Sequence, residues 1–581
     1  MRSSRKLLVS LTTSGAVVAA LMVTPSTAGA TPDGGQGQAA DTEYVVLVEA
    51  GADSADAVRA VEAAGGQVIK SNDSIGTLLV RGPGKGFSTR VAASPAIEGA
   101  ARNRAVGKAP KTPKSKVVEQ EHHASKGGTS KGGATRTTGA PAAARAVGMD
   151  PLDHKLWGLR MVRSDLARQA QPGKRAVKVA IIDTGVDGRH PDIKPNFDAA
   201  ASRNFAPDMP EVDGALCEFR GCVDPASWDD NGHGTHVAGT IGAAANNFGV
   251  SGVAPNVTLL NVRAGQDSGY FFLGPTTDAL AYAADAGVDV ANMSFYVDPW
   301  LYNCLDNPAD SAEAKAEQRT IIRSMRRALN YAHDHGVTLV GALGNNHEDL
   351  GKPREDTSSP DFPPGEEYPR PIDNATCWDL PVEGPHVIGV SSLGPSGRKS
   401  DFSNYGLERI EVSAPGGWYR DYFGTDWFRT NENLILSSYP VNALQAQGLV
   451  GPAGRITELG RAFGIMKRCP ADATGYKQCG YYNYLQGTSM AAPHASGVAA
   501  LIVSEYGSWP GDGTGFGLAP DTVRRILMSS AAERSCPTPR LVTYLDEGRD
   551  ETYNALCEGT REFNGFYGAG IVDAYAAVTH H

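Results

Sequence analysis

Three short motifs hold an aspartate, a histidine and a serine whose side chains could together perform nucleophilic chemistry. Asp183 lies in the stretch IIDTG, His233 lies in NGHGTHVAGT, and Ser489 lies in GTSMAAPH. Each motif alone is weak evidence. An Asp-Thr-Gly after a strand also occurs in aspartic proteases and around phosphoryl-transfer aspartates, a single histidine at a helix start is more often structural, and a serine before a helix is usually an N-cap.

In combination, the three residue types predict covalent catalysis by a serine. A serine hydroxyl is a poor nucleophile at neutral pH and needs an adjacent base. His233, which is neutral near pH 7, could take the hydroxyl proton and later pass it to a leaving amine. Asp183 could hold the other ring nitrogen, which would fix the tautomer and stabilise the imidazolium.

Taken together, the motifs resemble those of the subtilisin-like serine proteases, over roughly residues 150–581. The order Asp, His, Ser along the chain is the order in that family. The run Gly-Thr-Ser-Met-Ala-x-Pro-His is highly specific, and neither the G-x-S-x-G elbow of the α/β-hydrolases nor an aspartic protease accounts for all three motifs. The resemblance implies a secreted serine endopeptidase that hydrolyses protein or peptide substrates, with no cofactor required for catalysis.

The resemblance also assigns residues outside the three motifs. Asn345, which follows a strand pattern, corresponds to the asparagine that stabilises the oxyanion, with the backbone N–H of Ser489 as the second donor. Ser294 and Phe295 lie in the segment that pairs with the substrate as an added strand. This segment departs from the family, because Phe295-Tyr296-Val297 stands where Leu-Gly-Gly is usual. Bulky side chains there could reshape the substrate pocket, so no preferred substrate residue is predicted, and Phe295 could instead simply pack in the core.

Two further residues match calcium-ligand positions of the family. They are Asp192 in His-Pro-Asp and Asn246 in the loop 244–250. Carboxylate, amide and carbonyl oxygens suit calcium, so a structural calcium ion is possible. The alternative is that these side chains only cap turns, as loop Asp and Asn residues commonly do. His236 and His494 are predicted to be structural, since no third ligand is spaced to complete a metal site with His233 and His236.

The elements around the motifs predict an α/β fold. Nearly continuous apolar strand patterns at 177–182, 257–262, 337–342 and 386–390 alternate with helical patterns such as 277–286 and 321–335. Strands buried on both faces and separated by helices indicate a parallel sheet between helical layers. With the resemblance, the prediction is a subtilisin-like three-layer fold with a central, mostly parallel sheet in a catalytic domain at 150–581. His233 and Ser489 are farther apart than compact family members require, and the excess lies at 298–318, 346–385 and 417–484.

The first 149 residues predict three further segments of the chain. Residues 1–30 have a basic start, an apolar stretch and an Ala-Gly-Ala cleavage site, which is typical of a signal peptide. A membrane anchor is the alternative, but the apolar run is shorter than the roughly 20 residues that a spanning helix needs. Residues 41–107 have strand and helix patterns in the ferredoxin-like order. By the resemblance this α+β module is the inhibitory propeptide. A basic, flexible linker at 108–149 follows, and we expect maturation within it.

Charge and cysteine content narrow the class of protein. The formal net charge is −10. Residues 101–150 hold ten Lys and Arg against three acids, an excess of seven positive charges, so the remainder of the chain carries −17. Such an acidic body argues against nucleic acid as a partner. The eight cysteines favour disulfides in an exported chain, and no C-x-x-C or finger spacing supports zinc.

Eight cysteines allow 105 pairings, so the connectivity is not formally determined. Short loops suggest Cys217–Cys222, Cys469–Cys479 and Cys536–Cys557, which leaves Cys304–Cys377.

The sequence leaves two alternative functions to be considered. A ligase or cyclase would capture the acyl-enzyme with an amine instead of water, and a product assay on a linear peptide separates it from a hydrolase. A secreted binding protein on an inactivated protease fold is the non-enzymatic alternative, but all four catalytic positions hold competent residues.

Overall fold

The computed structural model describes residues 42–84, 86–103, 119, 150–509 and 515–580. The predicted signal peptide and all of the predicted linker except Glu119 lie outside these residues. In the described part of the chain, no helix is both long and apolar enough to cross a membrane.

The N-terminal module is a four-stranded antiparallel sheet with two helices. In chain order its elements are β1 (Thr42–Val48), α1 (Ser54–Ala63), β2 (Gln67–Asn72), β3 (Thr77–Gly82), α2 (Phe87–Val91) and β4 (Ile97–Arg102). The strands lie in the order β2-β3-β1-β4, so β1 pairs with both β3 and β4. This arrangement confirms the predicted ferredoxin-like order. Val46, Val61, Phe87 and other apolar side chains of the module form a core of their own.

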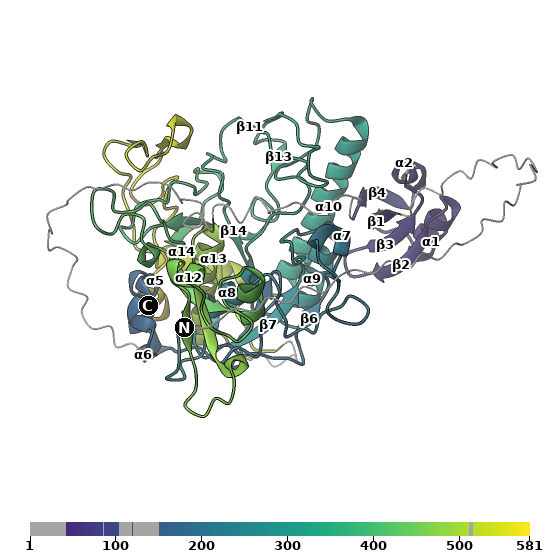
Figure 1. Ribbon diagram of the computed structural model, residues 1–581. Coiled ribbons are helices and arrows are strands. Elements are labelled where there is room, and N and C mark those ends of the chain that lie inside the picture. Colours follow the sequence, from purple (N-terminus) through teal and green to yellow (C-terminus); the bar gives the residue numbers. More distant parts are fainter. Residues whose placement is uncertain (1–41, 85, 104–118, 120–149, 510–514, 581) are drawn as a thin grey trace, which may run out of the picture. The chain divides into compact units, whose positions relative to one another are not determined.

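A parallel sheet of seven strands forms the centre of the larger part of the chain (Figure 1). Its spatial order is β15-β14-β10-β8-β5-β7-β6, and every pairing within it is parallel. The strands are β5 (Lys178–Ile182), β6 (Arg203–Asn204), β7 (Thr258–Arg263), β8 (Val290–Met293), β10 (Thr338–Ala342), β14 (Val387–Leu393) and β15 (Val412–Pro415).

Helices cover both faces of this sheet because successive side chains of a buried strand point to opposite faces. On β5, Val179 and Ile181 join the core beneath α8 (His233–Gly242) and α13 (Thr488–Tyr506), whereas Ala180 and Ile182 join the core beneath α9 (Leu273–Asp285) and α10 (Ala312–Asp334). The predicted three-layer α/β fold is therefore confirmed.

Smaller elements complete the described chain. The helices are α5 (Trp157–Met161), α6 (Ser164–Ala170), α7 (Pro210–Asp213), α11 (Val441–Ala446), α12 (Glu458–Ala462), α14 (Pro520–Ser529) and α15 (Ala574–Val578), with 3-10 turns at Asp153–Lys155, Asn431–Asn433, Tyr476–Gln478 and Glu551–Tyr553. The strands β16 (Ile435–Tyr439), β18 (Gly480–Leu485) and β17 (Met466–Arg468) form one antiparallel sheet, and β19 (Leu541–Val542) pairs with β20 (Ala555–Leu556).

Two of the predicted long insertions are joined to each other. The strand β9 (Asn303–Cys304) pairs with β13 (Cys377–Trp378), and β11 (Arg354–Asp356) pairs with β12 (Arg370–Ile372). The disulfide Cys304–Cys377 links β9 to β13. The other three disulfides also have the predicted partners, namely Cys217–Cys222, Cys469–Cys479 and Cys536–Cys557.

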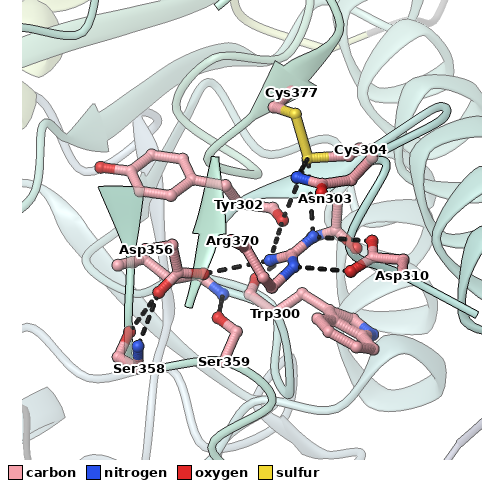
Figure 2. Close-up of polar contacts among 12 residues, drawn as sticks. Trp300, Tyr302, Asn303, Cys304, Asp310, Asp356, Ser358, Ser359, Arg370 and Cys377 are labelled. Carbon is pink, nitrogen blue, oxygen red and sulfur yellow. Dashed lines mark hydrogen bonds and ion pairs between the residues drawn. A yellow bond between two sulfur atoms is a disulfide. The ribbon is translucent and has the colours of Figure 1, made fainter. Parts of the chain in front are cut away.

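The buried guanidinium of Arg370 ties these insertions together, as Figure 2 shows. It makes two hydrogen bonds to the carboxylate of Asp310, at 2.9 and 3.0 Å, and one to Asp356 at 3.0 Å. It also donates to the carbonyl oxygen of Tyr302 at 3.1 Å and lies over the ring of Trp300, 4.6 Å from its centroid. All three charged side chains are inaccessible to solvent, so the two carboxylates depend on this one cation.

Candidate active site

Asp183 and His233 are hydrogen-bonded at the carboxyl end of the central strand β5. Asp183 is fully buried, and its Oδ1 accepts from Nδ1 of His233 at 2.7 Å and from the backbone N–H of Thr184 at 2.7 Å. His233 is the first residue of α8 and follows Gly232, whose φ of +100° favours glycine. Gly234 is required here because a Cβ would collide with the carbonyl oxygen of Gly185 and come within 3.0 Å of the Asp183 side chain.

Ser489 lies at the start of α13 and lines the same cavity as His233. Ser489 is 5% exposed, and its hydroxyl donates to the carbonyl oxygen of Ser294 at 3.4 Å. The outer nitrogen of His233, Nε2, lies 3.3 Å from Oε1 of Glu119. The structure thus brings His233 and Ser489 to one cavity, with Asp183 buried behind His233 and the carboxylate of Glu119 against the outer side of the imidazole.

Asn345 also lines this cavity, and Thr488 fixes its orientation. Its Oδ1 accepts hydrogen bonds from the backbone N–H of Thr488 at 2.9 Å and from the Thr488 hydroxyl at 3.0 Å. With the oxygen held, the amide nitrogen remains as the donor, which is the geometry that an oxyanion requires. The positioning role of Thr488 was not predicted, although its place directly before Ser489 was the signal that could have indicated it.

The predicted substrate-binding residues lie on the cavity wall. Ser294 donates its hydroxyl to the carbonyl oxygen of Ser489 at 3.2 Å and accepts from the Asn292 side chain at 2.9 Å. Phe295 lines the cavity and stacks on Phe271 with ring centroids 4.1 Å apart. The cavity has a volume of about 280 Å³, which is large enough for a side chain of a substrate.

The carboxylates of Asp183 and Glu119 both act on the pKa of His233. Burial lowers the pKa of His233, but the carboxylates of Asp183 and Glu119 outweigh it and raise this pKa well above its usual value. A protonated imidazole cannot accept a proton from Ser489. By contrast, burial lowers the pKa of His236 to about 3 and that of His494 to about 4, so both are neutral. Each bonds a backbone carbonyl oxygen, as expected for structural histidines.

The predicted calcium residues, Asp192 and Asn246, are neighbours, and their side-chain oxygens contact donors of the protein itself. Asn246 turns its Nδ2 toward Oδ1 of Asp192, at 3.3 Å, and its Oδ1 accepts from the backbone of Phe248 at 2.9 Å. Oδ2 of Asp192 accepts from the Tyr482 hydroxyl at 2.8 Å and from the Val250 N–H at 3.0 Å. A calcium site needs oxygens that face the ion, whereas these oxygens face N–H and O–H donors.

We therefore expect that removal of calcium leaves the stability of this region unchanged. The Ser489→Ala protein, which cannot digest itself, should melt at the same temperature in EGTA and in millimolar calcium chloride. A fall in EGTA that calcium restores, and that Asp192→Asn abolishes, would show instead that the loop rearranges around a bound ion.

Comparisons with known proteins agree with this arrangement. The model of the Subtilase family matches residues 174–570. Subtilisin DY from Bacillus licheniformis is 28% identical over 376 residues, which cover 64% of this chain and 90% of that protein. Fervidolysin from Fervidobacterium pennivorans is 27% identical over 377 residues, which cover 64% of this chain and 40% of that protein.

Solved structures share the fold. The epidermin leader peptide processing serine protease (EpiP) of Staphylococcus aureus has a TM-score of 0.59 and 21% identity, covering 93% of this chain and 98% of that one. Fervidolysin has a TM-score of 0.54 and 21% identity, covering 94% of this chain and 62% of that one. Since the family model spans more than half of the sequence, this chain belongs to the subtilase family of serine proteases.

Proposed function

We propose that the chain is a secreted serine endopeptidase that acts through Asp183, His233 and Ser489 and is made as an autoinhibited zymogen. One observation carries the proposal. Asp183 is hydrogen-bonded to His233 at 2.7 Å, and His233 lines one cavity together with Ser489 and Asn345. No cofactor takes part in the proposed acylation and deacylation.

Acylation transfers one proton and exchanges one bond. Nε2 of His233 accepts the hydroxyl proton of Ser489 while Oγ bonds to the carbonyl carbon of the substrate. The resulting oxyanion accepts hydrogen bonds from the Asn345 side chain and the Ser489 backbone N–H. When the C–N bond breaks, His233 returns the proton to the leaving amine.

Deacylation repeats these steps with water. His233 takes a proton from a water molecule, the hydroxide oxygen bonds to the acyl carbon, and the C–Oγ bond breaks as Ser489 regains its proton. Throughout, Asp183 stabilises the imidazolium and keeps its Nδ1–H directed away from the substrate.

Several contacts support autoinhibition by residues 41–107 and the linker. Arg102 in β4 pairs with Glu317 of α10 at 3.0 Å, and Asn103 accepts from the backbone N–H of Gly274 at 2.7 Å. Arg327 of α10 donates to the carbonyl oxygen of Val48 at 2.8 Å and pairs with Glu98. The buried carboxylate of Glu119 engages the nitrogen of His233 that would otherwise serve Ser489.

Secretion rests on the signal peptide predicted at residues 1–30 and is supported by the four disulfides, since these bonds persist in oxidising compartments. Protein or peptide substrates are the proposed partners, with the N-terminal module as an intramolecular one.

A serine-directed fluorophosphonate probe tests the catalytic assignment. We expect the secreted wild-type protein to be labelled at Ser489 and to begin, by N-terminal sequencing, within 108–149. The Ser489→Ala protein should neither take the label nor lose residues 41–107. Ser504→Ala, a buried serine of the same helix whose hydroxyl bonds the Ala500 carbonyl oxygen, is the matched control and should behave as wild type. Labelling that survives Ser489→Ala would rule out the proposed nucleophile.

Replacing Asn345 by alanine should lower kcat on a peptide substrate by roughly 10²–10³-fold with little change in KM, because the lost donor acts on the oxyanion and not on the bound substrate. This range comes from subtilisin, a relative of this chain, and is not calculated from the present geometry. Steady-state kinetics of the purified, processed variant measure it. A variant that loses affinity and keeps its turnover would place Asn345 in ground-state binding.

A further inference from the structure

The cavity that holds Ser489 is strongly acidic. Among the described residues that line it, five have carboxyl side chains and none is a lysine or an arginine. The five are Glu119, Asp298, Asp361, Glu367 and Asp379. Glu119 belongs to the linker that maturation is proposed to remove, so the other four would remain in the mature enzyme.

Asp379 is the most deeply buried of these five acids. The residue is 3% exposed, and Oδ1 is buried without a hydrogen-bond partner among the described residues. Asp379 also lines the cavity, and burying a carboxylate oxygen without a donor is costly, so a cation or donor bound there would offset that cost. Burial, followed by the nearby carboxylate of Glu383, raises the pKa of Asp379 well above its usual value.

Asp379 lies close to the segment that carries Asn345. Its Oδ2 is 3.4 Å from the position that a Cβ on Gly344 would take. Gly344 directly precedes Asn345, and its N–H donates to the Thr488 hydroxyl at 3.1 Å. The carboxyl group thus sits beside the two segments that carry the oxyanion donor and the nucleophile.

The two arginines described near this end of the cavity are already paired with other carboxylates. Arg354 pairs with Glu348 at 3.1 Å and Arg409 pairs with Glu383 at 2.9 Å, so both guanidinium groups already have carboxylate partners. Among the described residues around Asp379, three carboxyl groups therefore share two cations. The carboxyl groups are those of Asp379, Glu348 and Glu383, and the cations are Arg354 and Arg409.

The other acids are held in the wall by neutral donors. Oδ2 of Asp361 accepts from the Tyr296 hydroxyl at 2.6 Å, and Asp298 accepts from the backbone N–H of Phe271. Both carboxyl groups belong to the acidic lining of the cavity, and burial, followed by the neighbouring Asp361, raises the pKa of Asp298 well above its usual value. The rings of Phe271 and Phe295 provide an apolar surface that suits the aliphatic stem of a long basic side chain.

We propose that this cavity selects a lysine or arginine side chain at the substrate residue whose carbonyl group is attacked, with Asp379 as its ion-pair partner. The proposal rests on the proposed function and adds the class of substrate. A cation entering the cavity would pair with the carboxyl group of Asp379, which lines it, and charge-assisted bonds of this kind are shorter and stronger than neutral ones. Because the ammonium or guanidinium group carries N–H donors and methionine or glutamate does not, the site should discriminate strongly between them.

The test is a set of fluorogenic peptides that differ only at the residue before the cut, with Arg, Lys, Met, Phe or Glu at that position. For the processed wild-type enzyme we expect kcat/KM for Arg and Lys to exceed that for Met by about 100-fold or more. Asp379→Asn should remove most of this preference, and Asp379→Lys should shift it toward the Glu peptide.

Two further variants locate the effect. Asp285→Asn removes an exposed carboxylate of α9 and should keep the wild-type preference. Asp361→Asn removes a cavity carboxylate held by Tyr296 and should reduce the preference much less than Asp379→Asn. If Asp361→Asn abolishes the preference and Asp379→Asn does not, the assignment to Asp379 is wrong. Fluorophosphonate labelling of each variant confirms that its active site has formed.

Failure of this proposal is distinguishable from failure of the proposed function. A wild-type enzyme that takes the fluorophosphonate label and digests casein, but cuts after residues of all kinds, overturns the substrate class alone. A protein that takes no label and cuts no substrate overturns both.

Discussion

Replacing Ser489 by alanine should lower kcat for peptide hydrolysis by about 10⁶-fold, the largest effect expected of any single substitution in this chain. Without Oγ no acyl-enzyme forms, and the oxyanion donors alone supply only a small residual rate. This magnitude is that of triad removal in subtilisin, a relative, and is not calculated here. The assay compares purified proteins from which residues 41–107 have been removed by an added protease, because the variant would not process itself.

Two further variants check that the three residues act as a unit. Asp183→Asn should lower kcat by about 10⁴-fold, since an amide at this position favours the wrong tautomer of His233. The double variant of Ser489 and His233 should be no slower than Ser489→Ala alone. If the losses of the two single variants multiplied in the double variant, the residues would not share one mechanism.

Replacing Arg370 by methionine should destabilise the protein by about 3–5 kcal/mol, because it leaves two buried carboxylates without their cation. Asp310 and Asp356 are both inaccessible to solvent and both bond this guanidinium. For a domain of this size the melting temperature should fall by roughly 3–6 °C. Calorimetry of the Ser489→Ala protein at one scan rate measures the change without self-digestion.

Arg561→Met is the matched control for Arg370→Met. Arg561 pairs with Glu533 at 3.2 Å on the surface, where its side chain is 67% exposed, and such pairs contribute about 1 kcal/mol or less. An equal loss of stability in the two variants would show that the Arg370 cluster does not hold the insertions together.

The sequence predicted the parts of the site that lie in short motifs. Asp183, His233 and Ser489 each occupy a strand end or a helix start, and the parallel sheet brings such ends to one edge. Asn345 was found for the same reason, because it follows β10. The order of the seven strands was not predicted, since it depends on pairings between residues far apart in the chain.

Sequence reasoning missed the residues that the insertions contribute. Asp379 and Arg370 lie in 346–385, a segment without a motif or a periodic pattern, and their roles depend on partners that only folding brings near. The contacts of the predicted calcium residues had the same limit. The loop around Asn246 was visible, but Tyr482, which donates to Asp192 in the folded chain, is 290 residues away from Asp192.

The placement of Ser489 on α13 affects when proteolysis can begin. Every residue from Thr488 to Ser504 of this helix is buried between the sheet and its neighbours. A nucleophile on a surface loop could be positioned in a half-formed molecule, but this one is aligned only when the interior has closed around its helix. Chains that are still folding would therefore not cut one another, and proteolytic activity would begin only after the interior has packed around the helix.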